Sequence, residues 1–244
     1  MSATFHRLTE RARGLGRQEL TALLLVLLVA GGLWAFVEIA DEVDEGEAER
    51  FDAAVMRAMR SGEDYGDPLG PGWFEDMARD VTALGSFSVL GLVTLITAGA
   101  LWLQGMRRTA AVTAVAVLGA LALNLALKAG FDRARPDLVP HAADATTASF
   151  PSAHAMLSAV VYLTLGALVA QVQVRRRVKG FVIACAVVLA LLVGASRVYL
   201  GVHYPTDVLA GWAVGAAWAC LGWAAAVWWR RRATRLGSAG GSGP

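Results

Sequence analysis

Six long apolar runs divide this chain, and they limit its possible folds more than any other feature. They cover approximately residues 20–39, 84–103, 109–127, 155–174, 180–195 and 208–229, the fifth being the shortest. A helix of about 20 mostly apolar residues crosses the hydrocarbon core of a bilayer. With 56% of its 244 residues hydrophobic, the chain leaves little sequence for a separate soluble core. We therefore predict an all-α polytopic membrane protein with six transmembrane helices.

Basic residues flank these runs in a pattern that predicts how the chain crosses the membrane. Arginines and lysines precede the first run, separate the second from the third and the fourth from the fifth, and follow the sixth. Loops rich in Lys and Arg stay in the cytoplasm, so both termini are expected to be cytoplasmic. The loops 40–83, 128–154 and 196–207 then face outward. Because the basic clusters flank apolar spans, topology explains them better than nucleic-acid binding, and no nucleic-acid partner is expected.

The rest of the chain is read as one domain. Residues 1–236 are expected to form a single membrane-embedded unit, and the Gly/Ser-rich tail 237–244 is expected to be disordered. Residues 41–80 are expected to be an outer amphipathic segment. Within it, Phe51, Val55 and Met59 recur at the four-residue spacing of a helix with one apolar face. The sequence leaves open whether this segment is a lid or a strap on the surface.

Polar residues gather in three short segments at the ends of the runs. The first follows the third run, the second precedes the fourth, and the third joins the fifth to the sixth. Counted from a cytoplasmic N-terminus, all three segments reach the same, outer face of the membrane. Their chemically active members are Lys128, Asp132, Arg133 and Arg135 in the first, Ser152 and His154 in the second, and Arg197, His203 and Asp207 in the third.

Together these residues indicate a phosphate site. His203 and Asp207 are four residues apart, and Pro205 suits the first position of a helix. An imidazole held by a carboxylate on one ring nitrogen can use the other as a nucleophile or base. A guanidinium such as that of Arg197 binds phosphate oxygens. Ser152 is expected to cap the helix of the fourth run, and helix N-termini also favour phosphate.

The three segments resemble the signature of the type 2 phosphatidic acid phosphatase (PAP2) family. That signature reads Lys-x6-Arg-Pro, then Pro-Ser-Gly-His, then Ser-Arg-x5-His-x3-Asp. The chain has Lys128 to Pro136, Pro151 to His154 and Ser196 to Asp207 in this order and with these spacings. One position departs from the family, because Ala153 stands where the family has Gly. Its backbone N–H remains available, so activity is expected to survive.

The resemblance implies a role for each matched residue. His203 would attack phosphorus to give a phosphohistidine, Asp207 would hold its other ring nitrogen, and His154 would protonate the leaving oxygen and then activate water. The expected phosphate-binding groups are Lys128, Arg135, Ser152, Ala153 and Arg197. Neither a metal nor another cofactor is expected. Asp132, Arg133, His141 and Asp144 lie outside the motif, and a metal site at His141 and Asp144 lacks a third ligand nearby.

The implied function is metal-independent dephosphorylation of a lipid phosphate or diphosphate in a bacterial inner membrane, at a site facing the periplasm or exterior. Polyprenyl diphosphate, phosphatidylglycerophosphate, phosphatidic acid and lipid A phosphates all fit this family. One alternative is a phosphotransferase that passes the phosphoryl group from His203 to another lipid or a sugar. A lipid transporter fits less well, because the charges cluster at the ends of the spans. The oligomeric state does not follow from the sequence.

Overall fold

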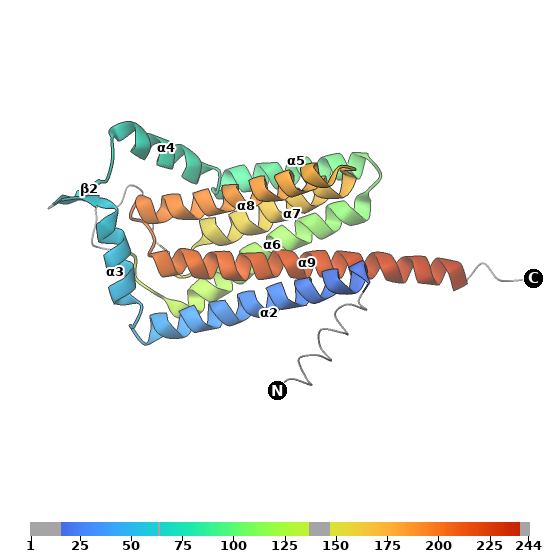
Figure 1. Cartoon of the computed structure of the whole chain (residues 1–244), viewed down its shortest axis with the longest axis horizontal. Helices are drawn as coiled ribbons and strands as arrows, with labels where there is room; N and C mark the ends of the chain where they lie inside the picture. The colour runs from blue at the N-terminus through green and yellow to red at the C-terminus, as the bar shows by residue number, and fades with distance from the viewer. Residues whose placement is uncertain (1–15, 63, 137–146, 240–244) are drawn as a thin grey trace, which may run out of the picture.

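A computed structural model describes residues 16–62, 64–136 and 147–239, most of which are α-helical (Figure 1). The described helices are α2 (Arg17–Asp44), α3 (Glu49–Ala58), α4 (Gly72–Ala83), α5 (Phe87–Leu103), α6 (Arg107–Phe131), α7 (Ala153–Val172), α8 (Arg176–Tyr199) and α9 (Pro205–Ala239). Between α3 and α4, strands β1 (Arg60–Ser61) and β2 (Asp64–Pro68) form a small antiparallel hairpin. The sequence did not predict this hairpin, which is too short to change the all-α class.

Among the described residues, five helices are long and apolar enough to cross a membrane, namely α2, α6, α7, α8 and α9. The pair α4 and α5, which is bent by 45° at a short break, passes the same test when taken together and is the candidate for a sixth span. Ser86 explains the break, because its Oγ accepts a hydrogen bond from Val89 N at 3.3 Å and so caps the start of α5. The predicted all-α polytopic fold is confirmed, with five spans, or six if the bent pair counts as one.

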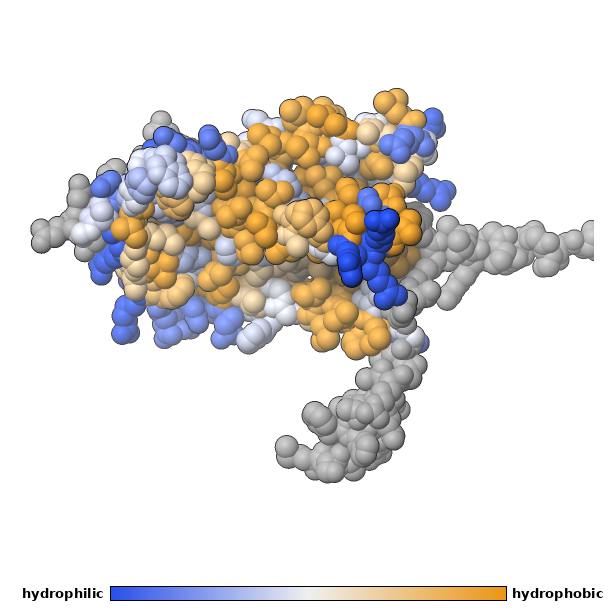
Figure 2. Space-filling model, turned by 45° about the horizontal axis from the view of Figure 1, so that its top comes forward, coloured by the Kyte–Doolittle hydropathy of each residue, from blue (hydrophilic) through white to orange (hydrophobic). Residues whose placement is uncertain are grey.

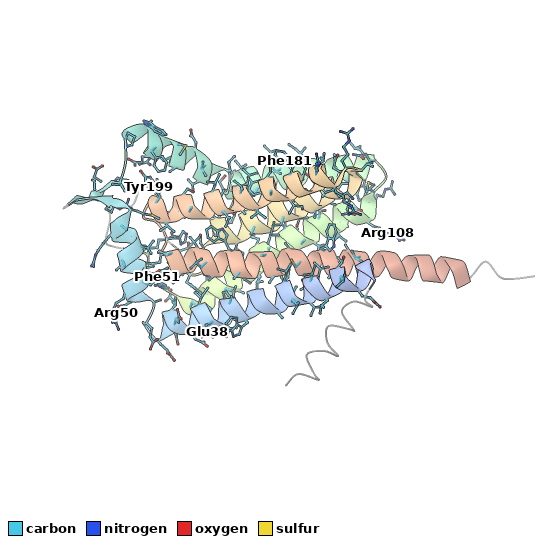
Figure 3. The ribbon with its side chains drawn as sticks, viewed as in Figure 1. Glu38, Arg50, Phe51, Arg108, Phe181 and Tyr199 are labelled. Atoms are coloured by element: carbon cyan, nitrogen blue, oxygen red, sulfur yellow. The ribbon has the colours of Figure 1, made fainter. Side chains whose placement is uncertain are left out.

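The outer surface of the bundle has the character of a membrane protein. Large apolar side chains such as Leu95, Leu103 and Phe181 are 70%, 88% and 69% exposed. On the face shown in Figure 2, apolar residues cover the length of the bundle and hydrophilic ones gather toward its ends. Figure 3 places Arg50 and Arg108 at opposite ends. Since exposed apolar surface of this extent is costly in water, we assign it to contact with lipid.

Helix α7 lies at the centre and packs against α5, α6, α8 and α9. Met156, Val160 and Val161 of α7 are fully buried in the main apolar cluster. Two glycines of α9 allow a very close approach to α7. A Cβ added at Gly211 would lie 2.8 Å from Ser152 O, and one at Gly215 would lie 2.6 Å from Met156 O. This close packing holds the first turns of α7 and α9 beside one another.

The start of α2 and the end of α9 lie at one end of the bundle, and α3 crosses the opposite end (Figure 1). Helix α9 begins at Pro205, as predicted, and continues to Ala239, beyond the predicted end of the sixth span at residue 229 and into the predicted tail. Residues 240–244 of that tail lie outside the described residues.

The predicted amphipathic helix is present as α3. Phe51 is 51% exposed, whereas Asp52 and Met56 are the most deeply buried residues of this helix. Met56 packs against Ala155, Val198 and Val208, from α7, α8 and α9. The side of α3 that faces the bundle therefore carries a buried acid next to an apolar anchor.

Candidate active site

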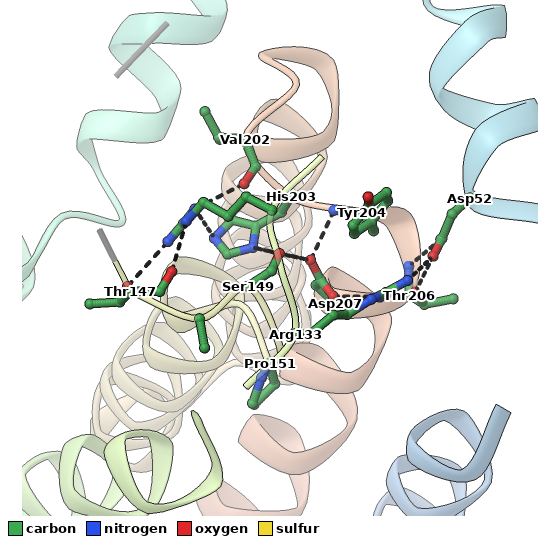
Figure 4. A network of polar contacts seen from close by, with 12 residues as sticks. Asp52, Arg133, Thr147, Ser149, Pro151, Val202, His203, Tyr204, Thr206 and Asp207 are labelled. Carbon is green, nitrogen blue, oxygen red and sulfur yellow. Dashed lines mark hydrogen bonds and ion pairs between the residues drawn. The ribbon is translucent and has the colours of Figure 1, made fainter. Parts of the chain in front are cut away.

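His203 lies in the short connection between α8 and α9, and its side chain is buried. Its Nδ1 is 3.3 Å from Oδ2 of Asp207, which belongs to the first turn of α9 (Figure 4). The other ring nitrogen, Nε2, lies 3.4 Å from Nη1 of Arg135. One nitrogen therefore faces a carboxylate and the other faces a cation. This arrangement orients the ring and leaves Nε2 on the side where an anion would bind.

The carboxylate of Asp207 is fully buried and receives hydrogen bonds at both oxygens. Arg133 Nη1 donates to Oδ1 at 2.7 Å. Tyr204 N donates to Oδ2 at 2.9 Å, and Ser149 Oγ donates to the same oxygen. A buried carboxylate is costly unless such donors surround it. These contacts fix the carboxylate in its charged form and in one orientation behind His203.

The environment of His203 favours its neutral form. Burial is the main cause that lowers its pKa from 6.5 to about 4, and the hydrogen bond and charge of Asp207 oppose this only in part. The positive charges of Arg197 and Arg135 lower the pKa further. A neutral imidazole has a free electron pair on one nitrogen, which a nucleophile requires.

Lys128, Arg135 and Arg197 lie close enough to one another to interact electrostatically. Lys128 Nζ donates to Ala148 O, and Arg135 Nη1 donates to Val202 O at 2.9 Å. Arg135 also donates from Nε to Thr147 O at 3.0 Å. Burial lowers the pKa of Arg135, although Asp207 partly offsets this. The backbone carbonyls hold the cations in place without neutralising their charge. The site is therefore suited to an anion.

Two buried donors in this region have no hydrogen-bond partner among the described residues. They are Nε of Arg197, in the last turn of α8, and Oγ of Ser152, just before α7. The same guanidinium is held at its Nη1, which donates to Thr82 Oγ1 at 3.1 Å. Because buried polar groups are rarely left without a partner, these donors indicate where a ligand oxygen would bind.

Ser152 occupies the predicted cap position, but its side chain does not cap the helix. Its backbone N–H instead donates to Asp207 O at 3.0 Å, which links the start of α7 to the start of α9. The first N–H groups of a helix have no partner within it. Since the hydroxyl does not occupy them, those of Ala153 and His154 are open to an anion.

His154 is only half-buried and lies in the first turn of α7. Within the described part of the chain it makes no hydrogen bond, and the ring of Phe87 lies 6.3 Å from its own. The structure therefore brings His154 to the same end as His203 without a direct bond between them. His141 and Asp144 lie outside the described residues. Elsewhere, in residues 16–62, 64–136 and 147–239, no group of His, Cys, Asp and Glu could hold a metal ion.

The sequence profile of the PAP2 superfamily matches residues 109–232, which include all three polar segments. The chain belongs to the PAP2 superfamily. A crystal structure of a transmembrane PAP2-type phosphatidylglycerolphosphate phosphatase from Bacillus subtilis has a TM-score of 0.72 and 28% identity, and the match covers 80% of this chain and 94% of that one.

Two curated relatives support the assignment to a family of phosphatases. Phosphatidylglycerophosphatase B of Bacillus subtilis is 37% identical over 146 residues, which cover 59% of this chain and 70% of the relative. Decaprenylphosphoryl-5-phosphoribose phosphatase of Mycobacterium tuberculosis is 34% identical over 142 residues, with 57% and 73% covered. Family and relatives together identify the chain as a membrane-embedded lipid phosphatase.

Several residues of this PAP2 site were not found from the sequence. The sequence placed Arg133 with the residues that indicate a phosphate site, but it did not reveal that the partners of its guanidinium are two carboxylates. Its Nη1 binds Asp207, its Nη2 donates to Asp52 Oδ2 at 2.8 Å, and its guanidinium carbon lies 4.2 Å from the centre of the Tyr204 ring. Although burial lowers its pKa, the two carboxylates raise it more strongly. Arg133 thus supports the two carboxylates.

Asp52 and Ser149 were also missed. Asp52 is fully buried and contacts Thr206 and Arg133, and Ser149 donates to Asp207. The amphipathic pattern of α3 indicated that one face would pack, but it gave no sign that an acid belongs to that face. Ser149 precedes the second motif by only two positions, and this proximity was the one available signal.

Proposed function

We propose that this PAP2 phosphatase removes the phosphate of a membrane lipid without a metal ion, through a phosphohistidine formed at His203. The observation that supports this best is the arrangement around His203. Its buried ring has Asp207 at Nδ1 and Arg135 at Nε2. The partnerless donors of Arg197 and Ser152 add hydrogen-bonding capacity for the phosphate.

In the first step, His203 Nε2 would attack phosphorus and the bond between phosphorus and the leaving oxygen would break. Lys128, Arg135, Arg197, Ser152 and the N–H groups at Ala153 would bind the three remaining oxygens, whose charge changes in the transition state. His154 would donate a proton to the leaving oxygen. Asp207 would stabilise the cationic ring of the phosphohistidine.

In the second step, His154 would take a proton from water as the water attacks phosphorus. The bond between phosphorus and His203 then breaks, and inorganic phosphate is released. Where the substrate was a diphosphate, the lipid monophosphate has already left in the first step. His154 ends protonated, ready for another cycle. The fixed cations would supply the charge stabilisation that metal ions supply in many other phosphoryl-transfer enzymes.

We place the site at the outer face of a bacterial inner membrane, because the arginine-rich ends of the spans favour the cytoplasmic side. A site at the end of the bundle suits a headgroup that enters from the outer leaflet. The names of the two relatives put phosphatidylglycerophosphate and phosphates of polyprenyl lipids first among the substrates to test.

The test uses the purified full-length protein in detergent with EDTA present. Release of phosphate is measured from phosphatidylglycerophosphate, phosphatidic acid, polyprenyl diphosphate and lipid A. We expect turnover of at least one of them, an acid-labile phosphoenzyme in the unaltered protein and none in His203→Ala. Activity that EDTA abolishes and a divalent ion restores would contradict the metal-free mechanism. Transfer of phosphate to an added lipid or sugar in place of water would instead show a phosphotransferase.

A further inference from the structure

Asp52 lies in α3, outside the three motif segments, yet its carboxylate joins the polar network through Thr206 and Arg133 (Figure 4). Oδ1 accepts a hydrogen bond from Thr206 N at 3.0 Å. Oδ2 accepts one from Thr206 Oγ1 at 2.6 Å and one from Arg133 Nη2 at 2.8 Å. The side chain is fully buried. A buried acid with three donors on two other segments holds those segments in a fixed relation.

Arg133 links this acid to Asp207. Its two terminal nitrogens bind one carboxylate each, at 2.8 Å for Asp52 and 2.7 Å for Asp207. Nη1 also donates to Thr206 Oγ1 at 2.9 Å. Without Asp52, the guanidinium would keep only one of its two ionic partners and could rotate away from Asp207. A buried ion pair that loses one partner leaves an uncompensated charge, which disturbs the remaining contacts strongly.

Apolar packing holds α3 at this position. Met56, one helical turn after Asp52, is buried against residues of α7, α8 and α9. After α3, Arg60 Nη1 donates to Tyr199 O at 2.9 Å, at the end of α8. Contacts on both sides of the site therefore fix the outer segment to the bundle. The outer segment 41–80 therefore packs on the bundle as a fixed strap, and Asp52 is its contribution to the site.

We propose that Asp52 is a positioning residue for catalysis, which acts through Arg133 and Thr206 to set the orientation of Asp207 behind His203. This inference rests on the proposed role of His203 as the nucleophile. Asp52 makes no contact with the expected phosphate position, so its loss should slow the chemical step and leave substrate binding nearly unchanged.

The first test compares Asp52→Asn with the unaltered full-length protein in detergent, and the probe is the one of the four lipids that the unaltered protein hydrolyses fastest. Because small displacements of reacting groups are costly, we expect kcat to fall roughly 10- to 100-fold while KM stays within about threefold. Glu49→Gln is the matched control, since Glu49 is an exposed acid of the same helix. It should change kcat by less than about twofold. A kcat of Asp52→Asn equal to that of the control would overturn the proposal.

A double-mutant cycle then asks whether Asp52 acts through Arg133. In an Arg133→Met background, Asp52→Asn should reduce kcat by no more than about threefold further, because the link is already broken. If Asp52→Asn lowers kcat by the same factor in the Arg133→Met background as in the unaltered protein, Asp52 acts independently of Arg133. That result would overturn the proposal that Asp52 acts through Arg133.

If Asp52→Asn proves unstable by size-exclusion chromatography or thermal unfolding, Arg133→Lys becomes the test. Lysine keeps the charge but cannot fork onto two carboxylates, so kcat should again fall with little change in KM. Unchanged kcat in Arg133→Lys would overturn the proposal. An unaltered protein that hydrolyses none of the four lipids would overturn the proposed function, and this inference with it. An active protein that tolerates the substitutions would contradict this inference alone.

Discussion

Nδ1 of His203 lies 3.3 Å from Oδ2 of Asp207, and both side chains are buried where the first turns of α7 and α9 meet. The four-residue spacing brings the two side chains together because His203 directly precedes α9 and Asp207 lies in the first turn of that helix. Among the described side chains, Asp207 is the only carboxylate in contact with Nδ1. This contact fixes the orientation of the ring. Its removal is therefore the most direct test of the proposed chemistry.

Asp207→Asn should reduce kcat by about 10³- to 10⁴-fold, the size of loss seen when a carboxylate behind a catalytic histidine becomes an amide. The amide keeps the shape of the side chain, but it loses the charge that stabilises a cationic His203 and the ion pair with Arg133. Steady-state release of phosphate from the best lipid substrate measures the effect. Asp76→Asn, at an exposed acid of α4, serves as the control. A loss of less than about tenfold would contradict the role of Asp207.

The stability of the protein should depend on pH through His203. Its pKa is about 4 in the folded protein and 6.5 when unperturbed, so between these values the unfolded chain binds more protons. Stability should therefore be fully present above pH 6.5 and decrease as the pH falls toward 4. Thermal unfolding of the unaltered protein and of His203→Gln in detergent measures this. The variant should show a shallower decrease over that window, and parallel curves would rule out a buried neutral His203.

Much of the fold could be predicted because a lipid environment leaves few choices. Each apolar run had to become a helix, since backbone groups in the hydrocarbon core must be paired within their own segment. The bend before α5 was harder to place. It depends on one capping side chain, Ser86, inside a stretch that is apolar on both sides.

The site was predicted where chemistry and sequence spacing coincide, and missed where contacts are distant in the sequence. Asp52 is 81 positions from Arg133 and 154 from Thr206. Nothing local distinguishes it from the other acids that follow the first span. Arg133 shows the same limit, because a sequence gives the charge of a residue but not its partner. Its partners are carboxylates, so it adds little to the field that attracts phosphate.

Arg197→Ala should reduce kcat/KM by about 10²- to 10³-fold, because this guanidinium is expected to bind charge that develops on the phosphate oxygens. The donor in question is Nε, which is buried and has no partner in the described part of the chain. Arg177→Ala is a matched control at the opposite end of α8, where the side chain is exposed. Both variants are assayed with the same lipid. Equal activity of the two would mean that Arg197 only anchors α8 to Thr82.

Gly215→Ala should lower both stability and activity, because α9 approaches α7 too closely at this point to admit a side chain. The added Cβ would lie 2.6 Å from the carbonyl oxygen of Met156, so the helices must separate. Overpacking of this kind typically costs about 1–3 kcal/mol. The displacement would also shift Asp207 away from Ser152, whose N–H donates to the Asp207 carbonyl at 3.0 Å.

Gly91→Ala is the control, since a Cβ at Gly91 on α5 would meet nothing within 4 Å. Thermal unfolding and phosphate release are measured for both variants. We expect Gly91→Ala to match the unaltered protein in both, and a Gly215→Ala protein of normal stability would show that the α7–α9 contact can relax without loss.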